Sequence, residues 1–518
     1  METIVKINDA VNGFVWTTVG VWLLIATGLI LTIITGFFQV RRIGHWMKKT
    51  VGSLFDKKVT GHTGEHASIS QFQALCTALA ATVGVGNIAG VSAAIITGGP
   101  GAVFWMWLAA FFGMMTNYSE NILGIYFRRK NHHGEWSGGA MYYLQDGLGG
   151  YKGCKTIGKI LAVIFALCAV LASFGIGNMG QINKIVINLT SAFDIRPLSS
   201  VVLYTSGDKS VNLYMVIVGL ILMLLVGVVV IGGLQRIAMV AEKIIPFMVV
   251  MYILGSLIII FTHIDHIGTA FGHIFSMAFT PKAAWGGAEG VLFSTIITQG
   301  CKRGVFSNEA GLGSSVMVHS NSNVKEPVKQ GLWGIFEVFA DTIIVCTMTA
   351  LVILTSGVID LDKGMTEYGD STLVAEAFNT IFNVGNVEYG RYFVAIAILL
   401  FAFTTVLGWS HYGTKAIEYL AGKNAPVATK IYKIVFVLMI ISGALMTSSI
   451  AWDISDTFNG MMMIPNLIGV LAMCPLVMKL TRNYVDRRIK GKDVEPMLSY
   501  DPEIQRENAK AIAETGED

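Results

Sequence analysis

Residues 82–90 read TVGVGNIAG, and positions 84–89 match the G-x-G-x-x-A spacing of a dinucleotide-binding turn. Such a turn needs a strand before it, a helix after it and an acidic residue about 20 positions further on. Here the glycines lie in the middle of the apolar run LCTALAATVGVGNIAGVSAAII, and the next acidic residue is Glu120. A second match, at 175–180, also lies inside an apolar run. The glycines therefore do not indicate a nucleotide site.

A break in a membrane helix is the second interpretation of this stretch. Glycine costs about 1 kcal/mol relative to alanine in a helix interior, so the three glycines beside Thr82 and Asn87 weaken the helix. Unwound backbone inside a membrane is tolerated only where it faces protein or a water-filled cavity. There it presents free N–H and C=O groups and two half-helix ends of opposite partial charge, which secondary transporters use to bind substrate and sodium. The remaining alternative is that the glycines only allow close helix packing.

The composition is that of a membrane protein. The chain has 518 residues, of which 53% are hydrophobic and 14% charged, and its mean hydropathy is +0.61. Soluble domains usually carry about 25% charged residues, so this chain has more apolar side chains than a water-soluble core can hide. The net charge of +3 is too small to indicate nucleic acid as a partner, whereas membrane lipid is an expected one. The six cysteines form no C-x-x-C, so neither a zinc site nor a disulfide framework is expected.

About eleven apolar segments reach the roughly 20 residues that a bilayer-spanning helix needs. They lie near residues 14–38, 71–97, 101–127, 157–188, 212–232, 237–262, 288–316, 329–356, 389–412, 429–449 and 453–479. The fold class is therefore all-α and polytopic. We expect an extra N-terminal transmembrane helix at 14–38, one group of five spans at 71–262, a second group at 288–479 and a charged cytoplasmic tail at 480–518.

Lys and Arg residues concentrate in alternate loops. The loops at 41–58 and 128–130 are basic, as is the tail after residue 480, whereas the long loop at 357–388 is acidic. Short loops rich in Lys and Arg stay in the cytoplasm. The sequence therefore predicts a multi-pass protein of the cell membrane with its N-terminus outside and its C-terminus in the cytoplasm.

The first segment of the second group also contains helix-breaking residues. It reads VLFSTIITQGCKRGVFSNEAGLGSSV over 291–316 and is interrupted by Gly300, Lys302, Arg303, Gly304, Asn308 and Glu309. Inverted-repeat transporters place interrupted helices at matching positions in their two halves. Two broken helices, each leading a group of five, therefore predict an inverted repeat. The alternative is that the span ends at Gln299 and that 301–309 is a cytoplasmic loop.

Three stretches resemble one known family. Residues 98–113, GGPGAVFWMWLAAFFG, resemble the signature of the alanine or glycine:cation symporters, that is, the sodium:alanine symporters. TVGVGNIAGV at 82–91 and GVFSNEAGLGS at 304–314 are also similar to that family. The resemblance covers about residues 14–480 and implies a LeuT-like fold of two inverted five-helix repeats plus one N-terminal helix. It also implies a transporter rather than an enzyme, which carries alanine or glycine inward with Na⁺ and has no organic cofactor or obligatory protein partner.

A zwitterionic substrate needs donors for its carboxylate and acceptors for its ammonium. Free N–H groups near Gly84 and Gly86 with the Thr82 hydroxyl suit the carboxylate, and exposed carbonyls at the breaks suit the ammonium. The expected substrate site comprises Thr82, Gly84, Gly86, Asn87, Gln181, Phe306, Asn308, Thr405 and Trp409. Phe306 and Trp409 are expected to form an apolar wall that limits side-chain size. By position alone, Trp409 also fits an interfacial anchor and Gln181 an interhelical hydrogen bond.

The resemblance places the coupling sodium ion between the carbonyls of Ala80 and Val83 and the hydroxyls of Thr404 and Thr405. Oxygen ligands suit hard cations. The alternative for the two threonines is hydrogen bonding to backbone carbonyls four residues earlier. A proton-coupled carrier should have a titratable group near the break, and positions 77–97 contain none, which favours Na⁺.

Other readings of the sequence are weaker. A channel or uniporter is disfavoured because no TVGYG filter or ring of charges is present, and the H-E-x-x-H and G-x-S-x-G motifs of enzymes are absent.

His62, Glu65 and His66 have helical spacing but no third ligand nearby, so a solvated turn is expected. Glu337 and Asp341 fit either an ion path or a pair with a buried lysine. Lys302 and Arg303 fit either a pair with Glu309 or the lining of a cytoplasmic exit.

Overall fold

The fold is taken from a computed structural model, which describes residues 2–61, 68–131, 134–206, 209–279, 293–360, 368–385, 387–446 and 450–515. Helices dominate the described chain. Its strands form three short antiparallel hairpins. These are β1 (Arg129–Lys130) with β2 (Trp136–Ser137), β3 (Val202–Ser206) with β4 (Lys209–Asn212), and β5 (Asn383–Val384) with β6 (Val387–Glu388). His62, Glu65 and His66 lie outside the described residues, as do 288–292 and 447–449 of the predicted spans.

The helices follow the order predicted from the apolar segments. The N-terminal run consists of α1 (Glu2–Gly13), η1 (Phe14–Gly20) and α2 (Val21–Ile34). The first group contains α6 (Gln71–Thr82), η3 (Gly86–Gly90), α7 (Val91–Gly98), α8 (Gly101–Tyr126), α10 (Lys155–Phe174), η6 (Gly175–Met179), α11 (Gly180–Ala192), α13 (Leu213–Ile231) and α14 (Gly233–Thr262). The second contains α16 (Phe293–Asn308), α17 (Val316–His319), α18 (Pro327–Val338), η8 (Phe339–Cys346), α19 (Thr347–Thr355), α21 (Tyr389–Ala421), α22 (Ala425–Ala444), α23 (Ile450–Ala472) and α24 (Cys474–Tyr484). Helices outside these groups include α4 (Ile43–Lys49), α12 (Arg196–Ser199), α15 (Ile267–Met277), α20 (Asp370–Asn379) and α25 (Pro502–Thr515).

The lengths and compositions of the helices confirm a multi-pass helical membrane protein. In the described chain, six helices are long and apolar enough to cross a membrane, or eight when two bent pairs each count as one span. One bent pair is Gln71–Thr82 with Gly86–Gly98, and the other is Asp453–Ala472 with Cys474–Ile489. The count of eleven spans and the two inverted groups of five stay predictions.

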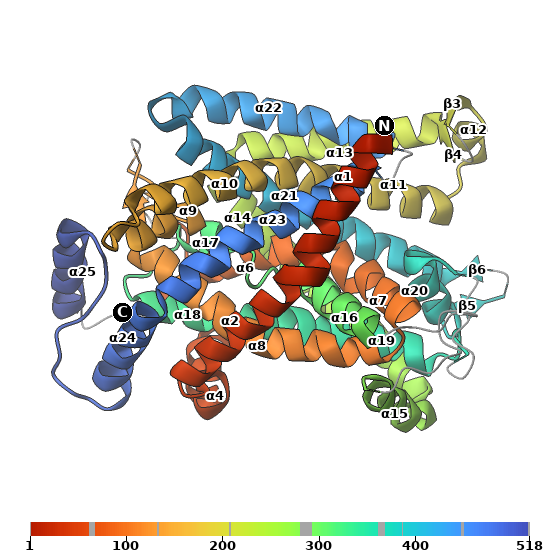
Figure 1. Cartoon of the computed structure of the whole chain (residues 1–518). Coiled ribbons are helices and arrows are strands. Elements are labelled where there is room, and N and C mark those ends of the chain that lie inside the picture. The colour runs from red at the N-terminus through yellow and green to blue at the C-terminus, as the bar shows by residue number, and fades with distance from the viewer. Residues whose placement is uncertain are drawn as a thin grey trace.

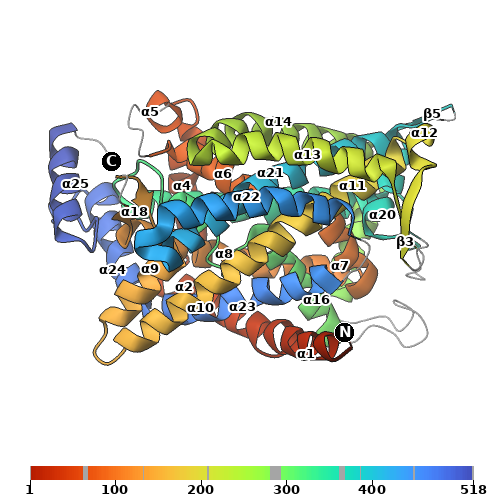
Figure 2. The same cartoon turned by 90° about the horizontal axis from the view of Figure 1, so that it is seen from above.

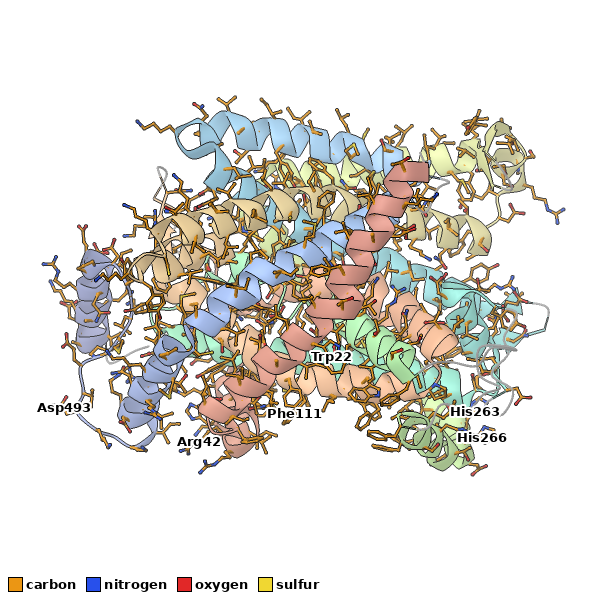
Figure 3. The ribbon with its side chains drawn as sticks, in the orientation of Figure 1. Trp22, Arg42, Phe111, His263, His266 and Asp493 are labelled. Carbon is orange, nitrogen blue, oxygen red and sulfur yellow. The ribbon has the colours of Figure 1, made fainter. Side chains whose placement is uncertain are left out.

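The long helices run side by side along one axis of the molecule, and the short elements lie at its two ends (Figures 1 and 2). The N-terminal helix begins toward the end that carries β3–β6, whereas α25 lies at the opposite end. Figure 3 places Arg42 and Asp493 at the end near α24 and α25, His263 and His266 at the other, and Trp22 and Phe111 between them.

Apolar side chains are exposed along the outer helices. They include Leu224 and Val228 on α13, Phe247 on α14 and Ile434 on α22, each more than half exposed. A soluble protein would bury most of such a surface, whereas a bilayer solvates it. The exposed apolar faces are therefore suited to contact with lipid.

The first predicted break is confirmed. Helix α6 begins with a capping box in which Ser70 and Gln73 bond each other's backbone, and it ends at Thr82. The chain resumes as a helix at Gly86 after a bend of 52°. The N–H of Gly84 donates to the side-chain oxygen of Asn87 (2.8 Å), so it leaves the helical ladder at this point. The glycines and Asn87 thus open the helix where the sequence predicted.

The second break lies further along the chain than predicted. Helix α16 is continuous from Phe293 to Asn308, so the prediction that Gly300 and Gly304 interrupt it is wrong, and so is the alternative that it ends at Gln299. A Cβ atom on Gly300 would lie 2.4 Å from the Ala102 carbonyl oxygen of α8. A Cβ atom on Gly304 would lie 3.4 Å from the Met106 Cα. These glycines allow close packing of α16 on α8.

The irregular segment runs from residue 309 to 315, between α16 and α17. Its backbone enters the left-handed region three times, at Glu309 (φ 56°), Gly311 (φ 90°) and Gly313 (φ 74°). Glycine adopts this region readily, but for a glutamate it is uncommon and strained. The predicted interruption is therefore correct at Glu309, where the helix has ended.

Candidate functional site

The two breaks face one small cavity inside the bundle. It is lined by Ala81, Thr82, Gly84, Gly86, Ile176, Gln181, Phe306, Glu309, Thr405, Trp409 and Asn459. The predicted substrate residues that the structure brings together here are Thr82, Gly84, Gly86, Gln181, Phe306, Thr405 and Trp409. The space open to the centre of a water-sized sphere is about 20 Å³. One water molecule needs about 10–15 Å³, so the cavity has room for one or two waters in this conformation.

Glycines form the walls where helices approach most closely. A Cβ atom on Gly84 would lie 2.5 Å from the Thr405 hydroxyl oxygen, and one on Gly86 would lie 3.0 Å from the Phe306 ring. On η6, a Cβ atom on Gly177 would lie 2.4 Å from the Trp409 ring. Backbone therefore reaches the cavity directly at Gly84 and Gly86, which line it, and backbone groups there can contact a ligand.

The structure places Asn87 and Asn308 outside the residues that line this cavity. The Asn87 amide donates to the Asp341 carboxylate (2.7 Å), and the Asn308 amide donates to the Thr342 hydroxyl (2.9 Å). Ser307 also donates to Asp341, at 2.7 Å. These bonds tie the first break and the end of α16 to η8, so both asparagines hold the framework of the site.

Asp341 is the most important residue that the sequence argument left open. Its side chain is fully buried, and its carboxylate accepts from Asn87, Ser307 and Thr342. Within the described residues, no ion pair joins it to a basic side chain. Positions 77–97 contain no titratable group, but the expectation that none lies near the break is wrong, because the fold brings Asp341 there from η8.

The predicted sodium ligands Thr404 and Thr405 face different neighbours. The Thr405 hydroxyl faces Gly84 of the first break and donates to the Phe401 carbonyl (3.0 Å). The Thr404 hydroxyl donates to carbonyls of its own helix and lies 3.8 Å from the Met248 sulfur of α14. Backbone bonding, the alternative for these threonines, therefore occurs at both.

The carbonyls predicted to bind sodium lie on either side of the end of α6. The N–H of Gly84, which would bond the Ala80 carbonyl in a continuous helix, donates to Asn87 instead. Val83 lies at the break itself, with a backbone conformation (φ −75°, ψ 89°) that is not helical. Both carbonyls therefore lie where the helical ladder is interrupted.

Buried polar side chains fix the second break. Asn466 of α23 donates to the Gly311 carbonyl (2.9 Å) and to the Glu120 carboxylate of α8, and Glu120 also accepts from the Gly311 N–H (3.5 Å). Glu309 accepts from Ser314 (2.5 Å), which closes the loop on itself. Side-chain hydrogen bonds therefore satisfy some of the backbone N–H and C=O groups that have no helical partner at this break. Buried polar groups need such partners.

The segments that flank this break are held in the same way. Glu337, for which a lysine partner was one expectation, pairs instead with His319 (2.9 Å). After α17, Arg128 donates to the carbonyls of Ser322 (2.6 Å) and Val324 (2.5 Å). Burial lowers the pKa of Arg128 to about 9, so its guanidinium stays charged at neutral pH.

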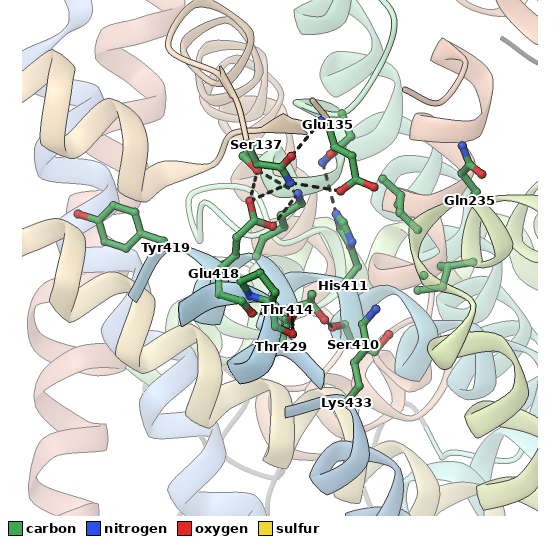
Figure 4. A pocket seen from close by; sticks show the side chains of 18 of the residues that line it. Glu135, Ser137, Gln235, Ser410, His411, Thr414, Glu418, Tyr419, Thr429 and Lys433 are labelled. Atoms are coloured by element: carbon green, nitrogen blue, oxygen red, sulfur yellow. Dashed lines mark hydrogen bonds and ion pairs between the residues drawn. The ribbon is translucent and has the colours of Figure 1, made fainter. Parts of the chain in front are cut away.

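A larger cavity of about 600 Å³ opens beyond Trp409, toward loops that the sequence predicts to be cytoplasmic. It is lined by Ser410, His411 and Glu418 of α21, by the loop with Ser137, and by residues of α22. Figure 4 shows Glu418 facing Ser137, with His411 and Lys433 nearby. Lys415 bonds Glu418 at 3.1 Å. This cavity is much larger than the one at the breaks, and charged side chains contribute to its lining.

Lys302 and Arg303 contact groups other than Glu309, one of the partners expected for them. Lys302 pairs with Asp456 of α23, with 2.6 Å between its nitrogen and the carboxylate oxygen, and it lies 5.4 Å from the Trp16 ring. Arg303 lies over the Phe306 ring at 6.0 Å. In the described chain, neither forms an ion pair with Glu309.

Comparison with known proteins agrees with this architecture. The model of the sodium:alanine symporter family matches residues 1–497. The chain is 40% identical to the sodium/alanine symporter AgcS of Methanococcus maripaludis, over 93% of this chain and 98% of that protein. It is 33% identical to YrbD of Bacillus subtilis, whose name describes a sodium/proton-dependent alanine carrier, over 93% of each chain. It is also 33% identical to GlnT of Bacillus subtilis, whose name describes a probable sodium/glutamine symporter, over 93% of this chain and 91% of GlnT.

Among solved structures, the fold is similar to that of MhsT in complex with L-phenylalanine. The TM-score is 0.51 at 12% identity, over 81% of this chain and 99% of MhsT. This likeness shows the LeuT-like fold alone. The relatives are transporters rather than enzymes, and together with the family model they identify a cation-coupled amino-acid transporter. The chain belongs to the sodium:alanine symporter family.

Proposed function

We propose that the protein carries alanine or glycine into the cell together with Na⁺ by alternating access. The observation that carries this proposal is the small cavity where the two breaks meet. Backbone groups at the first break suit a carboxylate, and the Phe306 and Trp409 rings in the cavity wall would limit the size of the side chain. Family membership supports cation coupling and an amino-acid substrate, and AgcS, a sodium/alanine symporter by name, supports the choice of alanine.

The substrate carboxylate is placed at the start of η3, near Gly84, Gly86 and the Thr82 hydroxyl. The first N–H groups of a helix lack intrahelical partners and carry partial positive charge. The substrate side chain then points toward Phe306 and Trp409, which close the apolar part of the cavity. Asn87 and Asn308 do not line the cavity, and their role is to hold the two breaks against η8 through hydrogen bonds.

The sodium ion is placed beside the first break, between the carbonyls of Ala80 and Val83 and the hydroxyls of Thr404 and Thr405. A hydroxyl that donates to a carbonyl keeps lone pairs for a cation, so the observed backbone bonds are compatible with this site. Sodium and substrate would both stabilise the unwound segment, and the coupling between them is reciprocal.

The two groups of five helices are proposed to rock against each other around this cavity. The larger cavity opens on one side of it, and the Lys302–Asp456 pair closes the other. With the N-terminus outside and the C-terminus in the cytoplasm, the present conformation is open toward the cytoplasm.

Uptake of labelled L-alanine into proteoliposomes tests the proposal. An inward sodium gradient should drive accumulation above the external concentration, and replacing Na⁺ by K⁺ should abolish it. Equilibration that ignores the gradient would identify a uniporter and refute symport. A panel of small L- and D-amino acids in competition then identifies the preferred substrate.

A proton-coupled carrier is the second candidate, because Asp341 is a buried carboxylate bonded to Asn87 of the first break (2.7 Å). The name of YrbD also includes protons. Under the sodium proposal, a proton gradient without Na⁺ drives no accumulation. Accumulation under that gradient, lost in Asp341→Asn, would establish the proton-coupled alternative.

Thr405→Val should raise the Na⁺ concentration for half-maximal uptake about tenfold, since it removes one oxygen ligand worth about 1–2 kcal/mol. Valine keeps the shape of threonine, so folding should change little. Thr355→Val is the matched control, because Thr355 is also buried and bonds a carbonyl of its own helix (2.8 Å) but lies away from the cavity. An unchanged sodium curve for Thr405→Val would remove Thr405 from the ion site.

Phe306→Ala should let larger amino acids compete. The ring of Phe306 lies against Gly86 and lines the cavity, and each methylene in such a pocket discriminates by about 1–3 kcal/mol. The ratio of inhibition constants for valine and alanine should fall at least tenfold in this variant. If the ratio stays at the wild-type value, Phe306 does not limit substrate size.

A further inference from the structure

We propose that the substrate's ammonium group is received by three side chains, Glu309, Gln181 and Asn459, and that the site selects primary amines. This inference rests on the proposed function, because it deepens the account of the same cavity. The three residues come from the second break, α11 and α23, and all of them line the cavity. Glu309 and Asn459 had no assigned role in substrate binding.

Two buried acceptors in the cavity have no partner in this structure. The side-chain oxygens of Gln181 and Asn459 are buried and make no hydrogen bond, although the residues are only 3% and 2% exposed. The Gln181 nitrogen donates to the Ile176 carbonyl (3.2 Å), which fixes the direction of its oxygen. A buried acceptor without a donor costs about 1–3 kcal/mol. A ligand that brings N–H donors into the cavity would remove this cost.

Glu309 supplies the negative charge that an ammonium group needs. It is 3% exposed, and among the described residues no Lys, Arg or His lies within ion-pair distance of it. Ser314 donates to its carboxylate (2.5 Å), and the Trp409 side chain is a further hydrogen-bond partner. A carboxylate has about four lone-pair sites, so accepting capacity remains for an ammonium group. The left-handed backbone at this position (φ 56°) is strained for a glutamate, and such strain is concentrated at ligand sites.

The number of acceptors matches the chemistry of the ligand. A primary ammonium group carries three N–H donors and one positive charge. One carboxylate oxygen and two amide oxygens pair with all three donors, and the buried charges compensate each other. A hydroxy acid brings no positive charge and only one donor, and an N-methyl amino acid brings one donor too few. The site should therefore reject both, even where their carbon skeleton equals that of alanine.

Binding of labelled L-alanine to the purified wild-type protein in sodium buffer tests this inference. Competitors are L-lactate, in which a hydroxyl replaces the ammonium group, and N-methyl-L-alanine. The wild type should prefer alanine over either competitor at least tenfold. Glu309→Gln should weaken alanine binding at least tenfold but leave lactate binding within about twofold, so the alanine-to-lactate preference should shrink.

Asn459→Leu removes one acceptor at nearly constant size. It should weaken alanine binding several-fold and N-methylalanine binding less, because the latter already lacks one donor. Asn178→Ala is the matched control: Asn178 is also buried and lies on η6, but it donates to the Phe436 carbonyl (2.7 Å) and does not line the cavity. The control should keep the alanine affinity of the wild type.

The outcomes separate the inference from the proposed function. If the wild type binds and accumulates alanine but Glu309→Gln and Asn459→Leu keep its affinity, the ammonium site is refuted and the symporter stands. Equal losses for alanine and lactate in Glu309→Gln would also refute it, because they would show a structural effect. If the wild type binds none of the amino acids, the proposed function itself fails.

Discussion

Uptake of alanine should fall at least a hundredfold when Gly84 is replaced by alanine. The added Cβ atom would lie 2.5 Å from the Thr405 hydroxyl oxygen and 3.6 Å from the Gln181 side-chain oxygen. Carbon atoms in real structures do not approach an oxygen that closely, so the first break and α21 must separate. The cavity of about 20 Å³ has no spare room for this shift. The methyl group also fills space that the substrate needs.

Gly90→Ala is the matched control for this experiment. Gly90 is buried on η3, six residues further along the same broken helix, but a Cβ atom there would meet nothing within 4 Å. Its substitution should keep wild-type uptake and stability. Proteoliposome uptake, with the thermal unfolding midpoint measured alongside, distinguishes a lost site from a lost fold. If Gly84→Ala transports like Gly90→Ala, the cavity is not the route of the substrate.

The first break was predictable because its cause is local. Three glycines and Asn87 lie within one short stretch, and backbone propensity together with one side-chain bond opens the helix there. The same reasoning misplaced the second break, because glycine has two uses in a membrane helix. Gly300 and Gly304 pack against α8, and only the structure shows which residues face that helix.

Asp341, whose role the sequence left open, and Asn459, which it did not indicate, are distant along the chain from the breaks. Asp341 reaches Asn87 from η8 (2.7 Å), and Asn459 reaches the cavity from α23. Asp341 lies beside Thr342 in an otherwise apolar stretch, whereas Asn459 follows several other polar residues of α23. In neither stretch does a periodic signal identify the partner of the residue. One signal was available: an ionisable residue inside a span is a candidate for function by default. That rule applies to Glu309 and Asp341 but does not say what they face.

Three helices pass the cavity in the same direction. Along α16 and its continuation, Phe306 lies at the cavity with Trp409 of α21, and Asn321 further on lies 3.4 Å from His411. Along α23, Asn459 lies at the cavity, and Asn466 further on bonds Gly311. Lys302 precedes Phe306 by about one helical turn, and Asp456 precedes Asn459 by about the same distance along its own helix. The ion pair therefore lies on the side away from the large cavity.

Breaking this ion pair should stop net uptake while keeping the fold. Lys302 and Asp456 are 16% and 9% exposed, and 2.6 Å separates their charged atoms. Asn12 also donates to Asp456 (3.1 Å), so the N-terminal helix joins the same closure. Removing one partner of a buried pair costs about 3–5 kcal/mol. In the proposed alternating-access cycle the pair forms only when this side is closed, so that cost would fall on the conformation open toward the large cavity.

Lys302→Ala and Asp456→Ala should each reduce sodium-driven alanine uptake at least tenfold, since 1.4 kcal/mol already changes an equilibrium tenfold. The exchanged variant Lys302→Asp with Asp456→Lys should recover most of the uptake, because attraction between the two positions is restored. Lys184→Ala is the matched control: Lys184 also pairs with an aspartate, Asp370, at 2.8 Å, but on helices away from this passage. Its uptake should equal that of the wild type. If the single variants transport normally, the pair does not close the carrier. If the exchanged variant is as inactive as the single variants, closure needs more than opposite charges at these two positions.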